Sequence, residues 1–486
     1  MTDTTHFYRP TDGWFGDVMP IVQDDTCHLF YTHLDSDDIG SPLRSKKLKW
    51  GHLSTTDFIH FTEHPTAIPA GTRDEPDLLA GAGSVIGPIG GRYIAYYVGI
   101  NPHARSHGQP EQVVLRAYST DLTTFTKDPD WQLAAPAGYH THAWRDPYVY
   151  RHPDGGWVML LCTQLDQTPA RRAGVIGVMR STDLETWKPD KPLWAPGITL
   201  APECPETFTL DGDQYLLFST YSDRFAVRYR RGNDGTWEVP AWDALDSNDF
   251  YAATSVDYRG ERILIGWLAT RLGDRDHGKR QWGGDLVVHR LTRREDGTLG
   301  TLPLASRTGD YQLQHLDVQA HVGNWDLEDD LISSTPSAGL NWASLGTVDT
   351  RRQSVCLTTT VTLDPEAEES GIAILADDEF SRAYLLRFEP KRQRFVLDRR
   401  PHTIEVPFDF DAERGYVSEP DFEIERPLHP SATHDVTIIL EGTCLSIYVD
   451  DIALTTRAYD IHHGHIAPYV CSGSINLHGT TIAMRH

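Results

Sequence analysis

Three acidic side chains, Asp17, Asp146 and Glu203, stand at the heads of stretches that otherwise have the composition of buried strands. Ionised side chains are almost never buried without a partner, so they need a special reason to be there. Cleavage of a glycosidic bond requires a protonated acid that assists the leaving oxygen and an ionised carboxylate that acts as nucleophile or base. A third carboxylate would accept hydrogen bonds from sugar hydroxyls. Three convergent acids would therefore suit this chemistry.

An internal repeat predicts how the three acids come together. Its unit is an apolar strand, a turn rich in Asp and Gly, and a second strand rich in aromatic and branched residues, which is the pattern of a β-hairpin. Five copies follow one another: DVMPIVQDDTCHLFYTH, GSVIGPIGGRYIAYYVG, RDPYVYRHPDGGWVMLLC, ECPETFTLDGDQYLLFST and ATSVDYRGERILIGWLA.

A second motif, a Ser/Thr and Asp turn before an aromatic residue, follows the first three copies as STTDFIHF, STDLTTF and STDLETW. The intervals from Asp57 to Asp121 and from Asp121 to Asp183 are 64 and 62 residues, which suits a four-stranded propeller blade. We therefore predict an all-β fold in which residues 1–305 form a five-bladed β-propeller. The first strand of each blade lines the central channel, so the three acids would occupy matching places at one mouth, where like charges raise the pKa of at least one of them.

The blade pattern stops near residue 306. Short alternating strands with Asp, Gly and Pro turns then predict a C-terminal β-sandwich, residues 306–486 with an N-terminal linker, that braces the propeller. Its expected strands include RQSVCLTTTVTL, AYLLRFEP, RQRFVLDR, HDVTIILEG, CLSIYVDD and INLHGTTIAM.

The site motifs resemble those of a known family. WFGDVMP, WRDPYVY, PECPETF, NDFYAATSV and QWGGDL are similar, in this order, to the motifs of glycoside hydrolase family 32, the invertases, fructanases and related β-fructofuranosidases. The similarity extends from residue 6 to residue 305, and LSIYVDDIALTTRAY resembles the accessory sandwich of that family. The resemblance implies a retaining hydrolase that acts on sucrose or short fructo-oligosaccharides.

The resemblance also implies roles for individual residues. Asp17 would be the nucleophile that forms a covalent fructosyl intermediate, Glu203 the general acid and later the base, and Asp146 the group that stabilises the transition state. Substrate-binding roles are expected for Trp14, Trp50, Ser84, Arg145, Tyr251 and Trp282.

Two positions depart from the family pattern. Gly16 stands where the family has Asn before the nucleophile, and Thr32 stands where it has Gln. Both changes remove an amide from the sugar subsite, so an unusual fructoside or transfer to a carbohydrate acceptor is compatible with the sequence.

Composition limits the kinds of partner that the chain is expected to bind and the cellular location that is expected for it. Sixty-nine acidic residues against 44 basic ones give a formal charge of −25, which disfavours nucleic acid and anionic membranes and favours a small neutral carbohydrate. The six cysteines are widely spaced, and the chain begins with no basic and apolar leader, so we expect a reduced, cytoplasmic protein. No cofactor and no metal are expected, because the histidines of HTHAW and DIHHGH lack a partner cluster. The sandwich could mediate a homo-oligomer.

Four alternative functions can be compared with the sequence. A fructosyltransferase of the same fold, including one that forms difructose anhydrides, would carry the same acids. An arabinan- or xylan-cleaving pentosidase could use a five-bladed scaffold with an inverting mechanism, although the RDP and ECP motifs argue against it. A non-catalytic sugar-binding protein would gain nothing from a repulsive acid cluster, and a phosphorylase would need more basic residues than Arg145.

Overall fold

The computed structural model describes residues 5–38, 46–221, 226–233, 236–306, 311–316, 318–328, 330–401 and 423–485. Strands joined by turns and short 3-10 segments dominate these residues, so the predicted all-β class is confirmed. The chain forms two compact units, residues 1–269 with 282–299 and residues 270–281 with 300–486. The predicted domain boundary between residues 305 and 306 stays a prediction. Within the described part of the chain, no helix has the length and hydrophobicity that a membrane span requires.

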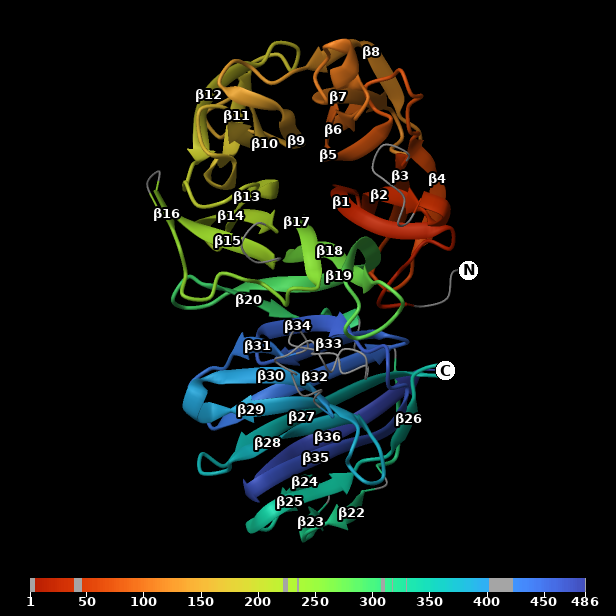
Figure 1. Ribbon diagram of the computed structural model, residues 1–486, viewed down its shortest axis with the longest axis vertical. Helices are drawn as coiled ribbons and strands as arrows, with labels where there is room; N and C mark the ends of the chain where they lie inside the picture. The colour runs from red at the N-terminus through yellow and green to blue at the C-terminus, as the bar shows by residue number, and fades with distance from the viewer. Residues whose placement is uncertain are drawn as a thin grey trace, which may run out of the picture. The chain divides into compact units, whose positions relative to one another are not determined.

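The first unit contains all five predicted hairpins (Figure 1). Their strands pair antiparallel as β1 with β2, β5 with β6, β9 with β10, β13 with β14, and β17 with β18. The strands of this unit are β1 (Gly13–Gln23), β2 (Thr26–Asp35), β3 (Leu48–Thr55), β4 (Thr62–Ile68), β5 (Leu79–Ile89), β6 (Arg92–Ile100), β7 (Gln112–Ser119), β8 (Thr126–Leu133), β9 (Tyr139–Arg151), β10 (Trp157–Leu165), β11 (Gly174–Ser181), β12 (Lys188–Trp194), β13 (Glu203–Leu210), β14 (Asp213–Thr220), β15 (Ala226–Asn233), β16 (Thr236–Glu238), β17 (Phe250–Tyr258), β18 (Glu261–Arg271) and β19 (Arg280–Arg293). The short strand β20 (Leu299–Leu302) follows, and all but its first residue belong to the second unit.

The first strands of the five hairpins form a closed ring. Strand β1 contacts β5, β5 contacts β9, β9 contacts β13, β13 contacts β17, and β17 contacts β1 again. Figure 1 shows these strands on the inner side of the unit, with the later strands of each repeat outside them. The heads of the five repeats are therefore brought to one centre, as the repeat predicted for the acids.

The repeated Ser/Thr and Asp turn has a structural reason. Asp183 accepts hydrogen bonds from the backbone N–H groups of Glu185 and Thr186, and Asp57 does the same for Ile59 and His60. The residue after each repeated Asp is left-handed, with φ between 61° and 64° at Phe58, Leu122 and Leu184. An Asx-type turn of this kind links the third and fourth strands of the first three repeats.

The second unit consists of two eight-stranded sheets that share one apolar core, so the six strands quoted above from its sequence are confirmed. One sheet has the order β23-β24-β36-β27-β32-β33-β34 with β21 beside β36, and the other has the order β22-β25-β35-β28-β29-β30-β31 with β26 beside β35. Their bounds are β21 (Gln312–Leu313), β22 (Gln319–Val322), β23 (Trp325–Glu328), β24 (Leu331–Ser334), β25 (Ser337–Ser344), β26 (Thr347–Asp349), β27 (Ser354–Leu363), β28 (Glu369–Ala376), β29 (Ala383–Glu389), β30 (Arg394–Arg400), β31 (Ile424–Pro427), β32 (Thr433–Glu441), β33 (Cys444–Val449), β34 (Ile452–Arg457), β35 (His463–Gly473) and β36 (Ile475–Arg485).

Candidate active site

Each inner strand carries a β-bulge near its head. In β9, for example, Arg145 pairs with Cys162 and Tyr148 pairs with Leu160, so two residues of β9 oppose one residue of β10. The same two-against-one arrangement occurs in β1, β5, β13 and β17. A bulge bends the strand and redirects its side chains, and such bulges are frequent beside active sites.

The three acids surround these bulges but are not in identical register. Glu203 is the last paired residue before the bulge of its strand, Asp146 is the first residue inside its bulge, and Asp17 is the second. The prediction that they occupy matching places is thus wrong, because relative to the bulge the position moves by one residue from Glu203 to Asp146 and by one more to Asp17. The stagger has a physical reason, because three carboxylates at one equivalent position would all point at the same spot, whereas successive positions distribute them around a pocket.

Backbone strain accompanies the bulges. The first bulge residue is left-handed in three of the five strands, with φ of 57° at Asp146, 47° at Cys204 and 48° at Ala252. Residues other than glycine adopt this conformation at a cost of about 1–3 kcal/mol, and such strain gathers at functional sites. In this site it turns the Cys204 N–H toward the Oδ2 atom of Asp146, which accepts its hydrogen bond at 3.0 Å.

A pocket of about 610 Å³ collects the three acids within the first unit. Its polar lining is Asp17, Lys46, Gln112, His142, Arg145, Asp146, Glu203, Tyr221 and Tyr251, and the remaining lining is Leu34, Leu48, Leu79, Gly81, Ala82, Val98, Ile100, Cys204, Ala252 and Trp282. The polar groups come mainly from β9, β13 and β17 and the aliphatic groups from β2, β3, β5 and β6. The pocket therefore has one charged wall and one apolar wall, which suits a ligand with both hydroxyl and C–H surface.

Glu203 is held by three hydrogen-bond donors. The Nε and terminal nitrogen atoms of Arg145 lie 3.1 and 2.9 Å from Oε1, and the Tyr251 hydroxyl donates to Oε2 at 2.7 Å. Arg145 Nε also lies 3.9 Å from Asp146 Oδ2, so one guanidinium serves two acids. Arg145 thus holds one carboxylate oxygen of Glu203 and Tyr251 holds the other, so the two residues together orient this carboxylate.

Asp17 and Asp146 share an environment that favours their protonated forms. Burial, and then the charge of Asp146, raise the pKa of Asp17 to about 8, against the hydrogen bond that Trp267 Nε1 donates to Asp17 Oδ1 at 3.0 Å. Burial raises the pKa of Asp146 to about 6, although the Arg145 charge opposes the shift. The cluster therefore retains a proton at neutral pH, as expected of crowded carboxyl groups.

Because Gly16 has no side chain, the indole of Trp282 can lie against its backbone. A Cβ atom at position 16 would stand 2.4 Å from the indole Cη2 of Trp282 and 2.4 Å from Thr32 Oγ1, closer than any real contact. Thr32 is the single residue that opposes Gly16 and Asp17 across the bulge. The two departures from the family pattern are thus neighbours, and the indole fills the space where a side chain at position 16 would stand.

Three predicted residues, Trp14, Trp50 and Ser84, are not among the residues that line the pocket. Trp50 is fully buried and its indole donates to the carbonyl oxygen of Gly81, a lining residue. The Ser84 hydroxyl donates to the Pro147 carbonyl oxygen and accepts from the Val149 N–H, which ties β5 to the bulge of β9. Trp14 is partly buried on β1 and pairs with Leu34. Of the nine predicted site residues, Asp17, Arg145, Asp146, Glu203, Tyr251 and Trp282 line the pocket.

Sequence reasoning missed the roles of Trp267 and Glu206. Trp267 is noted above as the donor to Asp17, from a strand 250 residues further along the chain. Glu206 is fully buried, accepts from the Ser255 N–H and hydroxyl, and pairs with Arg262 at 2.5 Å, so it ties β13 to β17 and β18. The motif PECPETF thus contains one pocket acid and one structural acid, which the sequence does not distinguish.

The candidate histidines of the sequence do not gather as metal ligands. The rings of His140 and His142 lie 4.7 Å apart, and His142 lines the pocket. His465 is hydrogen bonded to Ser344 and Asp378. Among the residues that the structure describes, the ligand atoms that group closely enough for a metal ion belong to Asp12, His33 and Asp35 instead.

Comparison with known proteins assigns the family of this carboxylate-lined, all-β chain. Residues 6–302 match the model of the glycosyl hydrolases family 32 N-terminal domain. The chain therefore belongs to glycosyl hydrolase family 32, and the resemblance inferred from the motifs is confirmed.

Curated relatives and a solved structure are similar to the chain. The chain is 28% identical to a sucrose-6-phosphate hydrolase of Escherichia coli over 62% of its own length and 64% of the relative's. It is 25% identical to a fructan 6-exohydrolase of Beta vulgaris over 59% of its own length and 51% of the relative's. The matches thus span less than two thirds of either relative. An exo-inulinase structure from Aspergillus awamori superimposes with a TM-score of 0.73 and 17% identity, over 99% of this chain and 97% of that one.

Proposed function

We propose that this chain is a retaining glycoside hydrolase that releases fructose from β-fructofuranosides such as sucrose or short fructo-oligosaccharides. The observation that carries the proposal is the convergence of Asp17, Asp146 and Glu203 on one pocket, with Glu203 oriented by Arg145 and Tyr251. The family match covers all five residues. The names of the relatives, which include a sucrose-6-phosphate hydrolase and a fructan exohydrolase, support the substrate class.

The proposed reaction proceeds in two steps. Glu203 donates a proton to the glycosidic oxygen while Asp17 attacks the anomeric carbon, which breaks the C–O bond and forms a fructosyl ester on Asp17. Glu203, now ionised, takes a proton from water, and the resulting attack releases fructose with retained configuration. Asp146 accepts hydrogen bonds from ring hydroxyls and stabilises the positive charge of the transition state.

The free pocket is not yet in the protonation state that this reaction needs. Burial keeps a proton on Asp17, which must be ionised to attack, and Glu203 accepts three hydrogen bonds from Arg145 and Tyr251. We infer that substrate hydroxyls that donate to Asp17 favour its ionised form and that the proton moves to Glu203 as the glycosidic oxygen arrives. The Tyr251 hydroxyl can then rotate and accept from the protonated acid.

We also infer that the ring of five inner strands is a five-bladed β-propeller and that the two eight-stranded sheets form a β-sandwich, as the sequence predicted. The closed contacts from β1 through β5, β9, β13 and β17 support the blade count. The shared core of the two sheets supports the sandwich. All six cysteines are free thiols, which supports a reducing, cytoplasmic location. The homo-oligomer stays a prediction from sequence alone.

The test is product release from sucrose, 1-kestose, inulin, levan and aryl pentosides. We expect free fructose from the wild type and its loss in both Asp17→Asn and Glu203→Gln, while Asp130→Asn, an exposed carboxylate of the same unit, behaves as wild type. If transfer products form instead of free fructose at high substrate concentration, the assigned activity would be fructosyl transfer and not hydrolysis. Turnover of pentosides alone, or fructose release that survives Asp17→Asn, would overturn the proposal.

A further inference from the structure

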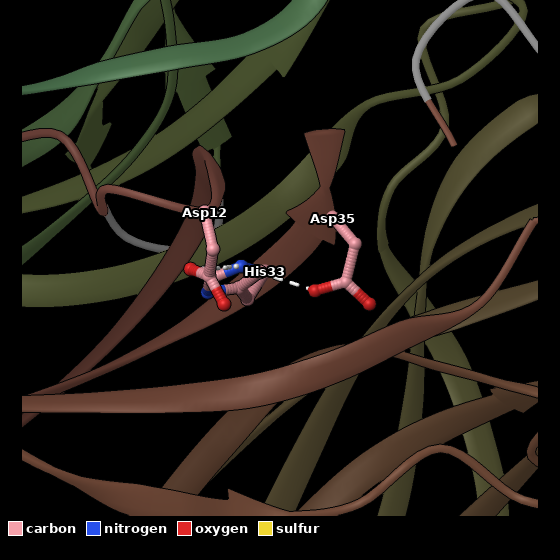
Figure 2. Close-up of side chains that lie close together, drawn as sticks. All are labelled: Asp12, His33 and Asp35. Carbon is pink, nitrogen blue, oxygen red and sulfur yellow. Dashed lines mark ion pairs between the residues drawn. The ribbon is translucent and has the colours of Figure 1, made fainter. Parts of the chain in front are cut away.

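Two carboxylates and an imidazole meet at one end of the β1–β2 hairpin, as Figure 2 shows. Asp12 directly precedes β1, and His33 and Asp35 lie near the end of β2. His33 Nε2 lies 3.2 Å from Asp12 Oδ1 and 3.4 Å from Asp35 Oδ1. We propose that Asp12, His33 and Asp35 bind one zinc ion, at a site separate from the catalytic pocket.

The buried imidazole is the observation that distinguishes this cluster from ordinary surface acids. His33 is only 4% exposed, and its Nε2 atom makes no hydrogen bond although it is aimed between the two carboxylates. Gly13 gives this atom its space, because a Cβ atom at position 13 would lie 2.7 Å from it. The two carboxylates are within ion-pair distance of this nitrogen, but neither accepts a hydrogen bond from it. A buried ring nitrogen without a hydrogen bond costs free energy, whereas a nitrogen that ligates a metal is fully satisfied.

The spacing of the ligand atoms fits a tetrahedral ion. Zinc binds nitrogen and carboxylate oxygen at about 2.0–2.2 Å, so neighbouring ligand atoms of a tetrahedron are about 3.3–3.5 Å apart. The two nitrogen to oxygen distances of 3.2 and 3.4 Å are close to that edge length. One nitrogen and two oxygens leave a fourth position for water, and the mixed set favours zinc over the all-oxygen sites of calcium and magnesium.

The ammonium group of Lys49 competes with a metal ion for the two carboxylates. Its ammonium lies 2.7 Å from Asp35 Oδ1 and 3.9 Å from Asp12 Oδ2, so it partly neutralises the cluster. Because the lysine is a flexible side chain near the surface, it can move into water when a dication arrives. Removal of its charge should therefore tighten zinc binding, which an ion-pair cluster without a metal function would not show. A bound ion would connect the segment before β1 with strand β2. Strands β1 and β2 form the hairpin that carries Asp17.

The experiment is calorimetric titration of the untagged, chelator-treated full chain with zinc chloride. We expect one zinc per chain at this site, at least about tenfold weaker binding in Asp12→Asn, and about two- to fivefold tighter binding in Lys49→Met. Asp12 is exposed, so its replacement does not endanger folding. His33→Gln, confirmed as folded by circular dichroism, should lose the site as well.

Asp25→Asn, which removes a carboxylate from the other end of the same hairpin, is the matched control and should bind as wild type. The proposal is overturned if no zinc binds, if Asp12→Asn binds as the wild type does, or if Asp25→Asn weakens binding equally. It is also overturned if Lys49→Met leaves the affinity unchanged. Magnesium and calcium chloride serve as comparison titrants, and binding as tight as that of zinc would contradict the assigned ion.

Discussion

Replacement of the proposed nucleophile should stabilise the protein while it abolishes activity. The pKa of Asp17 rises from 3.8 to about 8 because the carboxyl is buried among other acids. Such a carboxyl binds its proton more tightly in the native state than in the unfolded state. Between these two pKa values, the free energy of unfolding therefore falls as pH rises, by up to about 1.4 kcal/mol per pH unit. Over the whole window the cost is at most about 6 kcal/mol, and we expect about 2–3 kcal/mol because Asp17 keeps contact with water in the pocket.

Asp17→Asn removes this cost and keeps the oxygen that accepts from Trp267 Nε1. Urea unfolding followed by tryptophan fluorescence at pH 5, 6, 7 and 8 would measure the change. The variant should gain stability over the wild type progressively from pH 5 to pH 8, whereas the exposed control Asp130→Asn should show a constant difference near zero. A variant that is less stable than the wild type, or whose advantage does not grow with pH, would refute the electrostatic reasoning.

Three further predictions follow from the geometry. Tyr251→Phe removes the donor to Glu203 and should lower kcat about tenfold with a shifted pH profile, measured with sucrose. Gly16→Ala places a methyl group against Trp282, so it should raise KM more than it lowers kcat, and an unchanged KM would contradict the packing. Burial lowers the pKa of His52, so stability is lost as pH falls below about 6.5, and His52→Phe should reduce that loss in acid unfolding curves.

The sequence allowed the hairpins and the convergence of the acids to be predicted, because alternation and turn residues are local signals. It did not reveal the bulges, which depend on how each strand pairs with its neighbour. The stagger of Asp17, Asp146 and Glu203 was therefore missed. Long-range partners were missed for the same reason, since Trp267 and Asp17 are 250 residues apart along the chain.

Residue type alone also misplaced part of the substrate site. Trp50 and Ser84 were expected to bind substrate, yet their polar atoms are engaged with backbone groups behind the pocket wall. A tryptophan or serine in a motif has the same letters whether it contacts the ligand or supports the residue that does. Only the burial and the hydrogen-bond partners separate these two roles.

The central claim is that Asp17 forms a covalent bond to fructose while Glu203 serves as acid and base. The most direct measurement is mass spectrometry of Glu203→Gln after incubation with an aryl β-fructofuranoside, whose good leaving group needs little acid assistance. We predict that one fructosyl unit accumulates on the peptide that contains Asp17, because the base that would activate water is absent. A protein that remains unlabelled while it turns over the substrate, or a label on another residue, would contradict the account.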